Sequence, residues 1–188
     1  MRILLMGPQG SGKGTQAKRL ARAHGIAHVA TGDILRAAVA AGSELGRRVQ
    51  PILERGDLVP DELMIALIRE RLADEDGFVL DGFPRTLEQA EALDAMLEEI
   101  GKPLDAVVLL DVSDEVALQR LLGRRELEGR ADDTPEAIRR RLELYHQVTE
   151  PVLERYRARG CLVEVDGERP VEEVAAALEG VLAGMGAR

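Results

Sequence analysis

The sequence reads Gly7-Pro8-Gln9-Gly10-Ser11-Gly12-Lys13-Gly14-Thr15 directly after the apolar run Ile3-Leu4-Leu5-Met6. This spacing fits the phosphate-binding pattern G-x-x-x-x-G-K in the order strand, glycine-rich turn and helix, with the helix expected from Lys13 through Arg22. Glycines let backbone N–H groups approach a polyphosphate, and the helix N-terminus and Lys13 add positive charge. The stretch therefore predicts a nucleotide triphosphate site, rather than a plain turn carrying a surface lysine.

One position departs from that pattern. The Ser or Thr that usually follows the lysine is Gly14, and the hydroxyl comes one place later, at Thr15. The change weakens the case for direct Mg²⁺ ligation at this position. A carboxylate at the end of an apolar strand, Asp81, stands where a Mg²⁺-organising acid belongs in such proteins. Taken alone, Asp81 could equally be a turn-former.

Composition limits the remaining classes of function. A chain of 188 residues is long enough for one domain with a full core. A formal net charge of −9 argues against sequence-wide nucleic-acid binding, and no apolar run reaches the length of a membrane span. The single cysteine, Cys161, excludes an internal disulfide and a cysteine-cluster zinc site. The N-terminus runs straight into a strand, so we expect no signal peptide and a cytoplasmic location.

Strand and helix patterns alternate along the chain. We expect strands at 2–6, 27–30, 77–81, 105–111 and 161–165, where apolar runs predict burial on both faces. Thr86 and Gln89 resemble a helix-capping box, Pro135 opens a helix that Pro151 should kink or divide, and a last helix begins near Pro170. The alternation predicts a three-layer α/β/α fold with a five-stranded parallel sheet, whose ligands bind beyond the carboxyl ends of the strands.

Two segments interrupt this alternation. Residues 31–73 form a helical excursion between the second and third strands, and residues 124–134 are polar and charged without apolar periodicity. Both segments are interpreted as covers mounted on the core.

Arginines occur near the expected ligand-binding edge. Arg85 lies just beyond Asp81, and Arg36 follows the second strand, where Asp33 or Thr31 is expected to cap a helix. Two arginines around one pocket suit a phosphate monoester, because a guanidinium binds its oxygens bidentately. A third set comprises Arg120, Arg124, Arg130 and Arg141. Arg139 and Arg140 are interpreted as a solvated face, and Arg141, next to the apolar Leu142, as pointing inward.

The chain resembles the adenylate kinase family almost from end to end. Four ordered motifs carry the resemblance: Gly7 to Gln16, Thr31 to Arg36, Asp81 to Gln89 and Arg120 to Arg141. The resemblance implies one P-loop kinase domain over 1–188, in which a CORE carries a nucleotide-monophosphate-binding insertion at about 30–59 and a short LID at about 124–134. It implies phosphoryl transfer from ATP to AMP to give two ADP. It also implies Mg²⁺ as cofactor, held by Asp81 through water. The short LID implies no structural zinc.

The resemblance also implies roles for individual residues. ATP would be bound by Gly10, Ser11, Gly12, Lys13, Gly14, Thr15, Arg120, Arg124 and Arg169. AMP would be bound by Thr31, Arg36, Gly82, Arg85, Gln89, Arg130, Arg141 and the backbone of Asp57, Leu58 and Val59. The catalytic set would be Lys13, Arg85, Arg120, Arg124, Arg130 and Arg141. Gln89 has two competing roles, since a capping-box residue and an adenine reader would use the same side chain. We expect a monomer that binds neither nucleic acid nor membrane.

Two other functions stay open. A kinase for UMP or CMP is the nearer alternative, although Thr86 after Arg85, followed by Gln89, favours AMP. The more distant alternative is a nucleotide-dependent switch that hydrolyses ATP slowly, and it would need no second, arginine-lined pocket. Turnover that depends on an added monophosphate would separate the two classes.

Overall fold

A five-stranded, entirely parallel sheet forms the centre of the computed structural model, which describes residues 1–130 and 132–186. Its strands lie in the order β2-β3-β1-β4-β5. The strands are β1 (Arg2–Met6), β2 (Ala27–Ala30), β3 (Phe78–Asp81), β4 (Ala106–Asp111) and β5 (Leu162–Asp166). All five predicted strands are present, with bounds within one residue of those expected. The central strands are buried on both faces, as their continuous apolar runs predicted.

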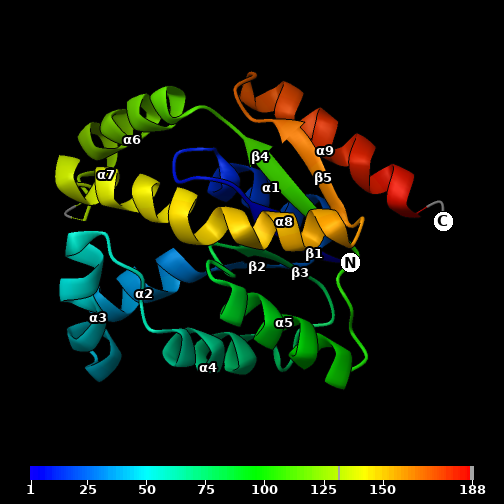
Figure 1. Cartoon of the computed structure of the whole chain (residues 1–188), viewed down its shortest axis with the longest axis horizontal. Coiled ribbons are helices and arrows are strands. Elements are labelled where there is room, and N and C mark those ends of the chain that lie inside the picture. Colours follow the sequence, from blue (N-terminus) through cyan, green and yellow to red (C-terminus); the bar gives the residue numbers. More distant parts are fainter. Residues whose placement is uncertain (131, 187–188) are drawn as a thin grey trace.

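Helices cover both faces of the sheet, which confirms the three-layer α/β/α fold (Figure 1). Helices α1 (Lys13–His24) and α9 (Val171–Gly186) pack on one face through residues such as Leu20 and Leu178. On the other face, α5 (Leu87–Glu99) and α8 (Glu150–Ala158) pack through Leu93 and Tyr156. None of the helices within residues 1–130 and 132–186 has the length and apolar character needed to cross a bilayer.

The excursion between β2 and β3 contains three helices: α2 (Thr31–Ala40), α3 (Glu44–Arg55) and α4 (Asp61–Leu72). Helices α2 and α3 pack against each other beside the sheet (Figure 1), whereas α4 contributes Met64 and Ile68 to the main core. The expected cap of α2 is wrong. The helix already begins at Thr31, with Ala30 as an N-cap that offers no side-chain acceptor, and Asp33 instead pairs with Arg36.

The segment 124–134, described above as polar and without apolar periodicity, is helical in its first part. Helix α6 (Asp114–Glu128) continues through its first five residues and ends where Gly129 adopts a left-handed conformation. Its last turn, residues 125–128, is exposed to solvent. This turn packs against nothing in the described part of the chain, so its sequence carries no apolar residues at helical spacing. The polar composition therefore indicated exposure rather than absence of helix.

The long helix around Pro151 is divided, as predicted. Helix α7 (Pro135–Leu144) is followed by one stretch of π-helix, η1 (Tyr145–Thr149), and then by α8, in which Pro151 lies in the first turn. Because proline has no N–H to donate, it fits a first turn more easily than a helix interior. Pro151 accordingly lies at the start of α8, which packs on the sheet through Val152, Leu153 and Tyr156.

Candidate active site

The glycine-rich loop joins β1 to α1, and its conformation requires glycine at two positions. Gly7 and Gly10 have positive φ values of 141° and 84°, and a Cβ on either would lie 2.5 Å from a backbone oxygen, that of Leu110 or Ala117. Glycine is therefore required at both positions. Helix α1 has Gly12 as its N-cap, no capping side chain and no acidic residue in its first turn. An uncapped helix N-terminus with this geometry attracts phosphate.

Lys13 lies at the centre of this loop. Its Nζ donates hydrogen bonds to the backbone oxygens of Gly7 and Pro8, both at 2.8 Å. Burial lowers the pKa of Lys13 to about 8, and the nearby Asp81 carboxylate opposes this shift only in part. The ammonium group is thus held within the loop by neutral carbonyl oxygens, where an incoming phosphate would give it a stronger partner.

Asp81 ends β3 beside the first turn of α1. A Cβ added at Gly14 would lie 3.6 Å from Asp81 Oδ2, so the glycine keeps the space beside the carboxylate clear of a side chain. No cluster of three potential metal-binding side chains occurs in the described part of the chain. A single carboxylate next to a phosphate loop fits Mg²⁺ that is held mainly by water and substrate phosphates, because Mg²⁺ dehydrates reluctantly. The arrangement does not resemble an all-protein metal cage.

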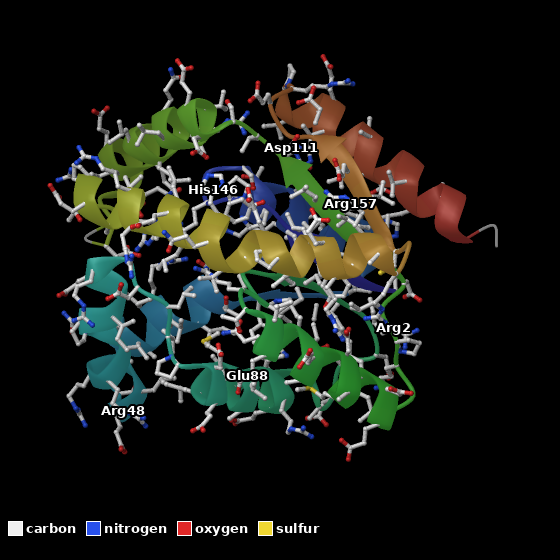
Figure 2. The ribbon with its side chains drawn as sticks, viewed as in Figure 1. Arg2, Arg48, Glu88, Asp111, His146 and Arg157 are labelled. Carbon is white, nitrogen blue, oxygen red and sulfur yellow. The ribbon has the colours of Figure 1, made fainter. Side chains whose placement is uncertain are left out.

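Two of the predicted arginines flank the end of β3 from different elements. Arg85 Nε donates to the backbone oxygen of Gly82 at 2.8 Å, and burial followed by the charge of Arg141 lowers the pKa of Arg85. Arg36, on α2, pairs with Asp33 and lies 3.8 Å from Asp132. Two arginines outside the cleft, Arg48 on α3 and Arg157 on α8, are exposed to solvent instead, and Arg48 lies at the lower edge of the molecule in Figure 2.

Two adjacent aspartates that the sequence interpretation missed, Asp132 and Asp133, bind Arg124 and Arg141. Asp133 is completely buried and accepts hydrogen bonds from Arg124 at 2.9 Å and from Arg141 at 2.7 Å. Asp132 accepts from Arg141 at 3.0 Å. The signal was available, because arginines that point inward need compensating carboxylates and Asp132-Asp133 lies between two of them in sequence. Arg141 is buried, as predicted from its position before Leu142.

The other predicted basic residues also reach the cleft. Arg120 Nη1 donates to the backbone oxygen of Gly167 at 2.9 Å and to that of Gly10 at 3.4 Å, and so joins α6 to the phosphate loop. Arg130 pairs with Glu128 at 2.6 Å, and Arg169 with Asp166 at 3.0 Å. Each of these arginines therefore already bonds an oxygen atom of the protein. A nucleotide phosphate at the same guanidinium group would compete with that oxygen.

Some predicted AMP-binding residues are not on the cavity walls. Thr31 is buried, with its hydroxyl donating to the backbone oxygen of Asp81, and Val59 is part of the core. Asp57 faces outward and pairs with Arg55 and Arg140. Gln89 is buried, accepts from the Arg85 N–H at 2.7 Å and donates to Asp61 at 2.8 Å.

The contacts of Gln89 bear on its two competing roles. The Gln89 N–H donates to the Thr86 hydroxyl at 3.1 Å, which confirms Thr86 as the cap of α5. In a complete capping box the Gln89 side chain would accept from the backbone N–H of Thr86, the N-cap residue. Here it accepts from the N–H of Arg85 instead, so only half of the capping box is formed. Both ends of the amide already have partners, and contact with adenine would require at least one of them to be exchanged.

Two adjoining cavities result from this arrangement. The larger, of about 550 Å³, is lined by the phosphate loop, Asp81 and six arginines: Arg36, Arg85, Arg120, Arg124, Arg130 and Arg169. The smaller, of about 40 Å³, is lined by Leu58, Phe83, Arg85, Arg141 and Tyr145, among others. The cavities meet at Lys13 and Arg85. A phosphate loop and several arginines in one cavity, with a smaller cavity adjoining at Lys13 and Arg85, are features of a P-loop phosphotransferase.

Comparison with known proteins narrows this class to one family. A family model described as "Adenylate kinase" matches residues 5–161. A protein named adenylate kinase from Stenotrophomonas maltophilia is 49% identical over 98% of this chain and 100% of its own length. Another of that name, from Thermus thermophilus, is 54% identical over 96% of both chains. The chain belongs to the adenylate kinase family.

The lowered pKa of Lys13 predicts a specific pH dependence of ATP binding. Bound phosphates favour the charged amine, so Lys13 keeps its proton to higher pH in the complex than in the free protein. Binding then takes up a proton above about pH 8, the value to which burial lowers the Lys13 pKa. Affinity should consequently be flat below that pH and fall above it, by at most about tenfold per pH unit.

Isothermal titration of ATP at constant ionic strength, from below to well above this pKa, measures the effect. Lys13→Met should bind ATP more weakly and lose the pH dependence. A fall of the same size in Lys13→Met would assign the titration to another group.

Proposed function

We propose that the protein transfers a phosphoryl group reversibly from ATP to AMP and yields two ADP, with ATP in the larger cavity and AMP extending from Arg85 into the smaller one. The observation that carries the proposal is the junction of the two cavities. The larger cavity, which contains the phosphate loop, and the smaller one, into which Arg141 projects, share Lys13 and Arg85 as lining residues, as direct transfer between two phosphate-bearing substrates requires. A protein that only bound or hydrolysed ATP would need no adjoining cavity lined by Arg85 and Arg141.

The larger cavity supplies the proposed ATP site. The backbone of residues 10–15 and the Lys13 ammonium would bind the phosphates, and Arg120 and Arg124 would approach them from α6. Arg169, in the loop before α9, lies at the rim of the same cavity, where the adenine would meet its backbone. Asp81 would hold Mg²⁺ through water, and the ion when bound would neutralise part of the phosphate charge. This part of the proposal rests on the position of each group in one cavity.

The proposed AMP site lies between the two cavities. Arg36 and Arg85 would grip the monophosphate, while Arg130 and Arg141 would reach it from the LID side. Thr31, Gly82 and Gln89, with the backbone of Asp57, Leu58 and Val59, would complete the site around the nucleoside. Leu58 already lines the smaller cavity, whereas Gln89 would have to exchange its bond to Arg85 or Asp61 for the adenine.

The chemistry needs charge compensation and alignment more than a proton acceptor. The attacking AMP phosphate is already ionised, so no general base is required. Lys13 and the arginines offset the repulsion between two anions and align the attacking oxygen with the phosphoryl group. Water is a competing acceptor. We propose that two segments, residues 30–59 and 124–134, close over the bound substrates and exclude water. Closure of the adenylate kinase lid is a familiar example of this behaviour.

The setting of the enzyme is also a proposal. The net charge of −9 disfavours nucleic acid as a partner, and the exposed large apolar residues of the described chain are spread over several elements, with Leu87 on α5, Leu127 on α6 and Val171 on α9. We therefore propose a cytoplasmic monomer that acts on free nucleotides, with Mg²⁺ as cofactor and without structural zinc.

A coupled assay tests the reaction directly. Purified protein with ATP and Mg²⁺ should form ADP only when AMP is added, and UMP or CMP should replace AMP poorly. Lys13→Met should lower this turnover by at least about 100-fold, because a charge at the reacting phosphates is removed. Circular dichroism of the variant controls for folding. Preference for a pyrimidine monophosphate, or slow hydrolysis that ignores every monophosphate, would refute the proposal.

Arg85 provides a test of where AMP binds. Arg85→Ala should weaken AMP binding by about 10- to 100-fold, the size expected for losing a charged hydrogen-bonding partner, and change ATP affinity by less than about twofold. Arg48→Ala, on the outer face of α3, is the matched control and should change neither. Separate titrations with each nucleotide measure both affinities. Equal weakening of ATP and AMP by Arg85→Ala would contradict the assignment.

A further inference from the structure

The junction between the two cavities contains one residue without a role in the proposed reaction. Four described residues line both cavities: Gln9, Lys13, Gly82 and Arg85. Lys13 and Arg85 carry the charges of the two sites, and Gly82 provides the backbone oxygen that holds Arg85. Gln9 is the third position of the phosphate loop and the remaining member of this set. Gln9 therefore lies at the boundary between the two cavities.

The amide of Gln9 is not used by the fold. Its Oε1 is shielded from solvent and has no hydrogen-bond partner in the described part of the chain. An unsatisfied buried polar atom is destabilising, so an apolar side chain of the same length would stabilise the free protein at least as well. Buried polar groups that have no partner are uncommon in folded proteins, and they concentrate where a ligand or a reaction needs them.

A carboxamide suits this position chemically. Its Nε2 donates to acceptors such as phosphate oxygens, and its Oε1 accepts from donors such as guanidinium or ammonium groups. The last side-chain torsion of glutamine is broad and roughly two-fold, so the two ends can exchange places at small cost. Gln9 can therefore lie between phosphate oxygens on one side and Arg85 or Lys13 on the other. Neither a carboxylate nor an apolar side chain could serve both.

We propose that Gln9 is a further catalytic residue, whose Nε2 donates a hydrogen bond to an oxygen of the phosphoryl group during its passage from ATP to AMP. The proposal rests on the proposed function, because it assigns Gln9 to that same reaction. The bond is made to the group in flight and not to either bound nucleotide alone. It therefore stabilises the transition state and leaves substrate binding unchanged.

Gln9→Met tests the proposal, since methionine keeps the length of the side chain and removes both amide atoms. The kcat should fall by about 100-fold, as is typical when one donor to a developing charge is lost, and KM for ATP and AMP should stay within about twofold. The melting temperature should be unchanged or higher, because the unpaired Oε1 is gone. Gln147→Met, which removes an exposed amide outside both proposed covers, is the matched control and should leave kcat unchanged.

Aluminium fluoride gives a readout that does not depend on turnover. With two bound ADP molecules it occupies the position of the transferring phosphoryl group. Fluoride-dependent tightening of ADP binding should be present in the wild type and largely lost in Gln9→Met, while ADP alone binds both equally. Gln9→Glu, nearly identical in shape but unable to donate when ionised, should lose the tightening as well and covers the case in which the methionine variant does not fold.

The outcomes separate the two proposals. If the wild type shows no AMP-dependent ADP formation, the proposed function is wrong. If the wild type turns over and a folded Gln9→Met keeps its kcat and its fluoride response, only the role of Gln9 is wrong. A variant that loses stability and weakens both nucleotides equally would indicate a structural role and would likewise overturn the assignment.

Discussion

Repulsion between two phosphate-bearing substrates is the constraint on which the rest of this structure depends. Transfer requires a triphosphate and a monophosphate to lie within bonding reach, and their charges oppose that approach. The fold meets the constraint by directing positive groups from several elements to one edge of the sheet: α1 supplies Lys13, the turn after β3 supplies Arg85, and α6 and α7 supply Arg124 and Arg141. Parallel strands make this possible, because all of their carboxyl ends meet at the same edge.

The same concentration of positive charge must be tolerated before any nucleotide binds. The protein does this with internal partners: loop carbonyl oxygens for Lys13, a backbone oxygen for Arg85, and the buried Asp133 for Arg124 and Arg141. Breaking a buried ion pair by removing one partner costs several kcal/mol, so these partners also fix the geometry of the free site. We propose that a nucleotide exchanges these partners for phosphate; in the free site, burial lowers the pKa of Lys13 to about 8.

Local chemistry explains which features could be predicted from the sequence. The strands, the phosphate loop, the cap at Thr86 and the division at Pro151 each depend on a few neighbouring residues, and all were predicted correctly. The features that were missed depend on distant ones. The pairing of Asp132 and Asp133 with arginines of α2, α6 and α7 follows from how those helices meet, and Asp33 lost its expected capping role because α2 begins two residues earlier. Likewise, the unpaired state of the Gln9 amide could be seen only once the surroundings of the loop were known.

A crystal structure with a bisubstrate mimic, two adenosines joined by a chain of phosphates, would show whether the two phosphate sites adjoin. The phosphate chain should run from the backbone amides of residues 10–15, past Lys13, to the guanidinium groups of Arg36 and Arg85, with one adenosine at each end. A complex in which the end of the chain that stands for AMP lies remote from Arg36 and Arg85 would contradict this arrangement.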